Sequence, residues 1–295
     1  MNRHQPTTQR FDIGGMTVTK IIDTVESFSP KVLYVDKDRS AFDPHLDWLQ
    51  PHFVDADKAM RLSIHSFIIE TRHHRVLVDT CIGNHKQGSG FPQWNDRTDS
   101  GYLTDLAAAG LRPEDIDYVF CTHMHVDHTG WNTRLRDGRW VPTFPNARYL
   151  FNRREWAAWE HSDNPHDKAT MTQNVLPIIE AGQVQWVDNH WAIDDQVELL
   201  PTPGHTPGHC SVRIAHRGAS AVITGDMMIH PVQIAEPGWH QRADADKALA
   251  VRTRQAFVDH HCDRDVMVLG THFHTPTGVY IVEHNGARRV RLPAD

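Results

Sequence analysis

Cysteine is scarce in this sequence of 295 residues. The four cysteines, Cys81, Cys121, Cys210 and Cys262, lie far apart and form no C-x-x-C pair. Such spacing argues against a disulfide framework and against a zinc site built from cysteine. A fold held by disulfides or by cysteine-bound zinc is therefore not expected.

Long apolar runs and an excess of basic residues are also lacking. Hydrophobic residues make up 39% of the chain, and the formal net charge is -7. No stretch approaches the length that spans a membrane, and residues 1–10 lack the apolar run of a signal peptide. A negatively charged chain is not built to bind nucleic acid. We therefore expect a cytoplasmic protein that acts on a small-molecule substrate, with no nucleic acid and no membrane as partner, and with homodimer formation left open.

The length allows one large domain or two small ones. Because no shift of composition marks a linker, we predict a disordered tail at residues 1–10 and a single domain over residues 11–295. Apolar patterning predicts many short strands with helices interspersed, which indicates the α/β class. The expected strands cover residues 16–22, 64–70, 75–79, 116–121, 147–151, 184–187, 196–200, 211–215, 221–224, 265–269, 279–282 and 288–292.

Helices are expected at residues 103–109, 153–161 and 244–261, and a helical stretch at 171–181 is interrupted by Pro177. The tryptophans Trp156 and Trp159 are interpreted as core residues. The segment between the first two strands is irregular and rich in proline, aspartate and aromatic residues. A long loop of this kind is equally suited to a packing or dimer arm and to a substrate lid.

The most informative stretch is Cys121–Gly130. It holds His123, His125, Asp127 and His128 within six residues, directly after a predicted buried strand. Alternate residues of an extended segment share a face, so His123 and His125 can point the same way. The tighter turn that follows can direct the side chains of Asp127 and His128 to a second position, apart from the one that His123 and His125 face. Imidazole and carboxylate ligands suit zinc and similar divalent ions, so the spacing favours two adjacent metals over a histidine-rich loop without metal.

This His-x-His-x-Asp-His pattern resembles the signature of the metallo-β-lactamase superfamily. The resemblance extends to Gly204-His205, Gly225-Asp226 and Gly270-Thr271-His272, which occur in the family's order. It implies a four-layered αββα sandwich and two zinc ions, with other divalent metals as alternatives. It also implies the ligands. One ion is held by His123, His125 and His205, the other by Asp127, His128 and His272, and Asp226 bridges them.

Several further residues have two interpretations. Asp79, in a turn similar to the family's Asp-Thr-Gly-x-Gly with Cys81 at the first glycine, either orients a ligand histidine or is a turn carboxylate. His209 is interpreted slightly more readily as a packing residue than as a support or proton donor at the site. His230 and Trp239 suit a pocket wall or a surface equally, and His274 competes with His272 as the last ligand.

The resemblance implies a hydrolase that uses a metal-bound hydroxide, which Asp127 would also orient. The stretches after Asp226 and around His272 are similar to the branch with methyl parathion hydrolase and its lactonase and esterase relatives. The related homoserine lactonases carry a tyrosine after the bridging aspartate, where this chain has Met228, Ile229 and His230. We therefore expect a small ester or lactone as substrate.

Other hydrolase readings are a phosphotriesterase, a glyoxalase II-type thioesterase and a β-lactamase. A persulfide dioxygenase with one iron is a second alternative, because it uses part of the same ligand set. A binding protein without catalysis would have lost at least one ligand, and all seven positions are filled.

Overall fold

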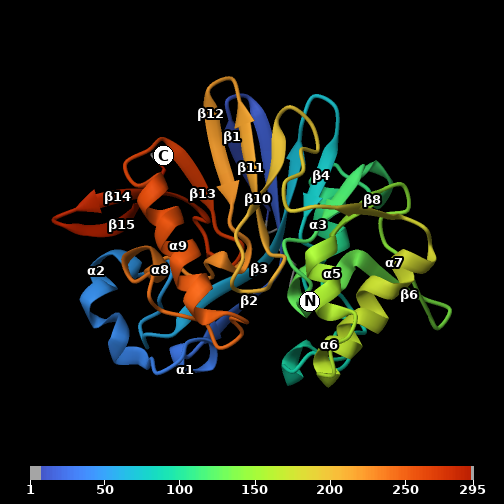
Figure 1. Ribbon diagram of the computed structural model, residues 1–295, viewed down its shortest axis with the longest axis horizontal. Helices are drawn as coiled ribbons and strands as arrows, with labels where there is room; N and C mark the ends of the chain where they lie inside the picture. Colours follow the sequence, from blue (N-terminus) through green and yellow to red (C-terminus); the bar gives the residue numbers. More distant parts are fainter. Residues whose placement is uncertain (1–7, 294–295) are drawn as a thin grey trace. The chain divides into compact units, whose positions relative to one another are not determined.

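The computed structural model describes residues 8–293 of the chain. These form two compact units (Figure 1). The first unit comprises the chain up to Thr24 together with Ile64–Asp188, and the second comprises Val25–Ser63 together with the chain from Asn189 onward. The prediction of a single domain is not tested by this division and remains a prediction.

The first unit is built on a seven-stranded sheet with the order β1-β2-β3-β4-β5-β8-β9. The strands of this sheet are β1 (Thr8–Ile13), β2 (Met16–Phe28), β3 (Met60–Glu70), β4 (Arg75–Val78), β5 (Tyr118–Phe120), β8 (Arg148–Asn152) and β9 (Val184–Val187). Residues 25–28 of β2 and 60–63 of β3 are assigned to the second unit. From β4 to β9 the neighbours are parallel. Val76, Leu77, Val78, Val119 and Phe120 are buried without alternation, as expected for parallel strands covered on both faces.

Several helices gather beside this sheet in Figure 1. They are α3 (Tyr102–Ala108), α5 (Arg153–Trp159), α6 (Pro165–Thr170) and α7 (Leu176–Glu180). The helical stretch around Pro177 is continuous through a π-helix, η5 (Met171–Val175), and Pro177 stands in the first turn of α7, where its missing N–H costs little. Trp159 is buried, as the core interpretation expects, whereas Trp156 is only partly so.

The second unit is built on a six-stranded sheet with the order β10-β11-β12-β13-β14-β15. Its strands are β10 (Val197–Pro201), β11 (Cys210–His216), β12 (Ala219–Ile223), β13 (Val266–Leu269), β14 (Gly278–His284) and β15 (Ala287–Arg291). All neighbours are antiparallel except β12 and β13. The long helix α9 (Lys247–His261) begins at Asp246, whose side chain accepts the N–H of Leu249.

Three expectations require correction. Residues 8–10 were assigned to the disordered tail, but they belong to β1, while residues 1–7 lie outside the described part. The hairpin of β6 (Thr133–Arg136) and β7 (Arg139–Pro142) was not foreseen, because its residues are only partly buried and show little apolar alternation. The segment after β2 is not irregular but forms three short helices, α1 (Pro30–Leu33), η1 (Arg39–His45) and α2 (Leu46–Leu49).

The aromatic residues of that segment decide what it does within the second unit. Phe42, Tyr34 and Phe53 are fully buried. Phe42 and Tyr34 pack against Trp239, and Phe53 packs against Phe273. Such burial is what a packing segment requires, because each ring removes a large apolar area from water.

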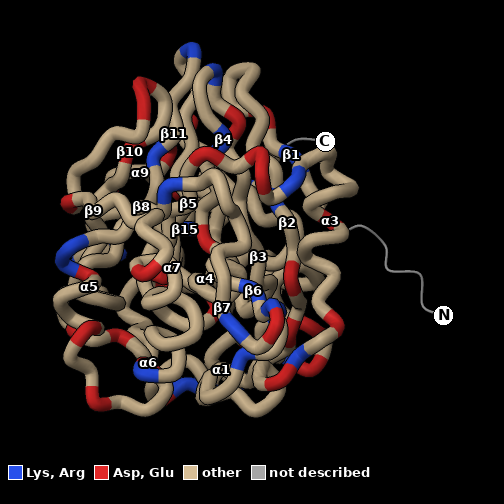
Figure 2. Tube along the Cα trace, turned by 90° about the vertical axis from the view of Figure 1, so that its right-hand side faces the viewer, with Lys and Arg blue, Asp and Glu red and all other residues tan. Residues whose placement is uncertain are grey.

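The α/β class is confirmed by the mixture of sheets and helices in both units. In the view of Figure 2, Lys and Arg are interspersed with Asp and Glu along the described trace. Among the described residues, we find no helix that has both the length and the apolar character needed to cross a membrane.

Candidate metal centre

In the first unit, the candidate ligands lie in the loop that follows β5 and in the short helix α4 (Val126–Thr129) after it. His123 and His128 are fully buried, while His125 and Asp127 are partly exposed. The turn closes on the loop after β4, where Thr80 N–H donates to the His128 carbonyl and Gly130 N–H donates to the Cys81 carbonyl. A Cβ at residue 130 would lie 1.8 Å from the Ile82 carbonyl oxygen, so only glycine fits there.

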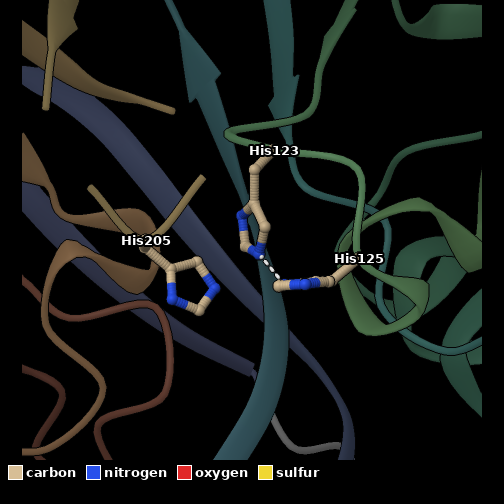
Figure 3. Close-up of side chains that lie close together, drawn as sticks. All are labelled: His123, His125 and His205. Atoms are coloured by element: carbon tan, nitrogen blue, oxygen red, sulfur yellow. Dashed lines mark hydrogen bonds between the residues drawn. The ribbon is translucent and has the colours of Figure 1, made fainter. Parts of the chain in front are cut away.

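His123 and His125 converge through ring nitrogens. His123 Nε2 lies 2.8 Å from His125 Nδ1 (Figure 3). At zinc–nitrogen distances of 2.0–2.1 Å, two nitrogens on one ion lie about 3 Å apart. The other nitrogen of His123, Nδ1, lies 3.1 Å from the Thr122 hydroxyl oxygen. The pair is therefore spaced as two ligands of one ion, with His123 using Nε2 and His125 using Nδ1.

His128 is oriented by Asp79. Its Nδ1 lies 3.0 Å from Asp79 Oδ2, and its Nε2 lies 3.7 Å from Asp127 Oδ1. Asp79, at the end of β4, is buried and also accepts hydrogen bonds from the Thr122 N–H at 2.7 Å and from its hydroxyl. The carboxylate therefore contacts the back of the imidazole, the geometry by which outer carboxylates fix the orientation of ligand histidines.

In the second unit, His205, Asp226 and His272 come from three separate turns. Asp226 Oδ2 lies 3.6 Å from His205 Nε2, and Asp226 Oδ1 lies 3.1 Å from His272 Nε2. Each carboxylate oxygen thus faces a different histidine. A carboxylate with this orientation is suited to contact two ions, one beside each imidazole.

The outward nitrogens of these two histidines also have partners. His205 Nδ1 lies 3.0 Å from Asp244 Oδ1, and His272 Nδ1 lies 3.3 Å from the Ser63 carbonyl oxygen. Gly204 lets the His205 turn approach α9, because a Cβ there would lie 2.4 Å from backbone atoms of Ala250. Both imidazoles therefore present Nε2 on the side of Asp226.

The other residues singled out from the sequence differ in their surroundings. His209 is fully buried, accepts the Asp226 N–H at Nε2 over 2.9 Å, and has its Nδ1 2.8 Å from the Thr202 hydroxyl oxygen. It therefore holds the backbone of Asp226. His274 is partly exposed, and its Nδ1 lies 3.2 Å from the Thr275 carbonyl oxygen. Within the second unit, His272 and not His274 is thus the histidine beside Asp226.

His230 and Trp239 are buried rather than on the surface. His230 Nε2 lies 2.9 Å from the Phe53 carbonyl oxygen, and its Nδ1 accepts the Val232 N–H. Burial lowers the pKa of His230 to about 4, so the ring is neutral at physiological pH. Trp239 packs against Tyr34 and Phe42. Both side chains therefore belong to the packed interior of the second unit.

Sequence reasoning missed three buried groups near the candidate ligands. Glu155 accepts the N–H of Met124, between His123 and His125, and that of the Trp159 indole. Asp244 contacts His205, and Arg254 lies 3.7 Å from Asp244. Asp244 and Arg254 are far from the ligands in sequence and carry no motif. The one available signal was that charged residues on apolar helix faces are rarely buried without a partner.

Comparison with known proteins identifies the family. The family model described as the metallo-beta-lactamase superfamily matches residues 59–264, and the chain belongs to this superfamily. An N-acyl homoserine lactonase of a Bacillus species is 26% identical over 174 residues, which cover 55% of this chain and 62% of that protein. The N-acyl homoserine lactonase AttM of Azorhizobium caulinodans is 31% identical over 132 residues, 41% of this chain and 45% of that protein. The chain thus spans less than two thirds of the length of these relatives.

Solved structures extend the match in fold to almost the whole chain. AidC, a dizinc quorum-quenching lactonase in complex with a product, aligns with a TM-score of 0.80 at 18% identity over 98% of both chains. The hydrolase AbOPH of the beta-lactamase superfamily aligns with a TM-score of 0.81 at 21% identity over 99% of both chains. At these identities the similarity establishes the shared fold.

Proposed function

We propose that this protein is a dinuclear metal hydrolase that opens a small lactone or ester. The proposal takes the ligands that the family resemblance implies: His123, His125 and His205 for one ion, and Asp127, His128 and His272 for the other. In this proposal Asp226 would bridge the two ions.

The observation that carries the proposal is the orientation of the histidines. Four imidazoles have their Nδ1 atom within 3.3 Å of an oxygen, on Thr122, Asp79, Asp244 or Ser63. A hydrogen bond at Nδ1 fixes the tautomer that has its lone pair on Nε2, the arrangement that second-shell partners impose on metal-binding histidines. His209 has a similar orientation, but its Nε2 accepts the Asp226 N–H, whereas the Nε2 atoms of the four imidazoles lie beside other candidate ligands. The donor set of imidazoles and carboxylates fits zinc.

Two divalent ions would polarise the carbonyl oxygen of the substrate and lower the pKa of water enough to supply a nucleophile at neutral pH. The residues of the chain supply the rest. Asp127 is the partly exposed carboxylate of the first unit, so one oxygen can bind an ion while the other accepts a hydrogen bond from the attacking water. Asp226 lowers the combined positive charge and is held in place by His209.

The choice of a lactone rests on the relatives, which are N-acyl homoserine lactonases. The chain departs from them at the positions after Asp226. Where those lactonases resemble one another in carrying a tyrosine, this chain has His230, which contacts the Phe53 carbonyl and the Val232 N–H within the second unit. The acyl part of the substrate is therefore left open within the lactone and ester class.

The test combines metal analysis with a substrate panel. Gently purified protein should contain about two zinc ions per chain and hydrolyse lactones or esters faster than phosphotriesters, thioesters or β-lactams. His123→Ala should abolish turnover and release metal, while His73→Ala, at an exposed position in the β3–β4 turn, should change neither. One iron per chain, with oxygen consumed on a persulfide substrate, would replace the proposal with the dioxygenase. Full hydrolysis by metal-free protein would end it.

A further inference from the structure

Asp244 is a buried carboxylate outside the proposed ligand set. Its side chain is fully shielded from solvent. It lies in the segment before α9, which runs along the His205 turn: Ala245 N–H donates to the His205 carbonyl at 3.0 Å, and Asp246 N–H donates to the Gly204 carbonyl at 2.9 Å. These backbone contacts hold Asp244 in register with His205.

The two oxygens of Asp244 have different partners. Oδ1 lies 3.0 Å from His205 Nδ1, and Oδ2 accepts the Gln241 N–H at 2.8 Å. Arg254 Nη2 lies 3.7 Å from Oδ2. Gln241 in turn donates its side-chain amide to the Asp226 carbonyl at 2.8 Å. The same network thus reaches both His205 and the backbone of Asp226.

Arg254 gives the carboxylate a buried positive partner. This side chain of α9 is fully buried, and it donates to the carbonyls of Met227, Pro237 and Trp239. A buried carboxylate stays charged only when such a partner and hydrogen bonds compensate its lost hydration. Because Oδ2 already accepts the Gln241 N–H and lies beside Arg254, Oδ1 is the oxygen that faces His205 Nδ1 as a hydrogen-bond acceptor.

We propose that Asp244, held in place by Gln241 and Arg254, is a positioning residue that sets the tautomer of His205. With the proton fixed on Nδ1, the lone pair of Nε2 points to the side of Asp226, where the proposed function requires a metal ligand. The role of the Nε2 lone pair as a metal ligand rests on the proposed function. The tautomer itself is a property of the protein without metal.

The substitution Asp244→Asn separates this role from simple packing. It keeps the shape but replaces one acceptor with an N–H₂ donor. The asparagine side chain has one oxygen, but the Gln241 N–H and the His205 Nδ1–H each need an acceptor at this position. When the amide oxygen faces Gln241, its N–H₂ group faces His205 and favours the tautomer with the proton on Nε2. That tautomer cannot bind a metal through Nε2.

The first measurement uses the wild-type protein. Nitrogen-15 NMR of histidine-labelled, metal-free protein at pH 8, with the His205 signals assigned by loss in His205→Gln, reports which ring nitrogen holds the proton. We expect the Nδ1–H form in the wild type and in Asp246→Asn, the matched control. Asp246 is exposed, lies two residues along the chain, and caps α9 through an oxygen that asparagine also has. A wild-type His205 protonated on Nε2 would overturn the proposal.

The second measurement follows metal. Competition with a chromophoric chelator should show one of two zinc sites weakened about 10–100-fold in Asp244→Asn, the range for lost second-shell partners, and no change in Asp246→Asn. The visible spectrum of the cobalt-substituted protein should change in the same variant. If Asp244→Asn is folded with wild-type affinity and spectrum, Asp244 does not position His205. If the Asp244→Asn variant does not fold, the His205 tautomer measured in the wild-type protein still tests the proposal. Wild-type protein that binds no zinc but has the Nδ1–H form would end the proposed function alone.

Discussion

The two units supply their candidate ligands in opposite ways. The first unit places four within residues 123–128, in the loop after β5 and in one helical turn. The second places three on separate turns between residues 205 and 272. In the first unit the backbone of a single turn fixes the spacing of the ligands. In the second, spacing depends on buried contacts made by Asp244, His209 and Ser63.

The outer carboxylates differ as well. Asp79 accepts hydrogen bonds from Thr122 and contacts His128, all within the first unit. Asp244 contacts His205 and is paired with the buried guanidinium of Arg254. The comparison teaches that the contiguous cluster is supported by hydrogen bonds from the neighbouring loop after β4 and from Glu155, whereas the dispersed set depends on a buried ionic network. Substitutions in the second unit should therefore disturb residues that lie farther from the substituted position.

The largest expected effect concerns Asp226. Asp226→Asn keeps the shape but removes the charge that faces both His205 and His272, so two bound ions would repel more strongly. Turnover of the best lactone or ester, measured under saturating zinc, should fall on the order of 10²–10³, the range for loss of a key electrostatic group. Asp137→Asn, at an exposed turn of the first unit, is the control. Near-normal turnover with both ions bound would remove Asp226 as the bridge.

The next effect concerns the choice between His272 and His274. His272→Ala removes the imidazole 3.1 Å from Asp226, so one zinc site should weaken by about 100-fold or more, beyond the 10–100-fold range of second-shell changes. His274→Ala should keep both affinities, with any change confined to KM. Equilibrium dialysis of both variants against zinc buffers gives the comparison. The opposite pattern would move the ligand to His274.

A smaller effect is expected for the outer carboxylate of the first unit. Asp79→Asn replaces an acceptor beside His128 and Thr122 with a donor, so metal affinity or turnover should fall about 10–100-fold. The loss should be well below that of Asp226→Asn in the same assay, with circular dichroism to confirm folding. An equal loss would place Asp79 in contact with the metal and not behind a ligand.

The smallest effect concerns His230 in the second unit and the stability of the protein in acid. His230 titrates at about 4 in the folded protein, against about 6.5 when unfolded. The unfolded chain therefore binds a proton in this window that the folded chain does not, so the free energy of unfolding falls as pH drops from 6.5 to 4. The total is up to about 3.5 kcal/mol, from a difference of about 2.5 pKa units at about 1.4 kcal/mol per unit. Urea unfolding of His230→Gln should show a flatter pH dependence than His73→Gln, whereas identical slopes would refute the assignment.

The contiguous cluster could be predicted from the sequence because its four candidate ligands lie within six residues, so the local backbone alone keeps them close together. Strand alternation predicted that His123 and His125 share a face. In the structure both lie in the loop after β5, which ends at Phe120, and their ring nitrogens converge there. His205, Asp226 and His272 were expected only through the family resemblance, since no local pattern joins residues so far apart. Asp244 and Arg254 were not foreseen at all. Their pairing depends on how α9 packs, which periodicity does not reveal.

The fold shows the same limit. Strongly apolar stretches such as β4 and β13 were predicted within a few residues. The short helices between Pro30 and Leu49 were missed, because Pro30 and Pro44 stand inside or at the start of them and their length gives no helical period. The burial of Tyr34, Phe42 and Phe53 stabilises that segment. Tertiary packing therefore determined what local propensity did not.

The contact of Gly130 with the Ile82 carbonyl has a consequence for loop grafting. The loop after β4 and the turn after β5 are joined by backbone hydrogen bonds in both directions: Thr80 donates to His128, and Gly130 and Trp131 donate to Cys81 and Thr80. Neither loop can change length without displacing a carbonyl that the other uses. The transplantable module is therefore not the histidine motif alone but the pair of loops, residues 79–83 with 122–131, exchanged together.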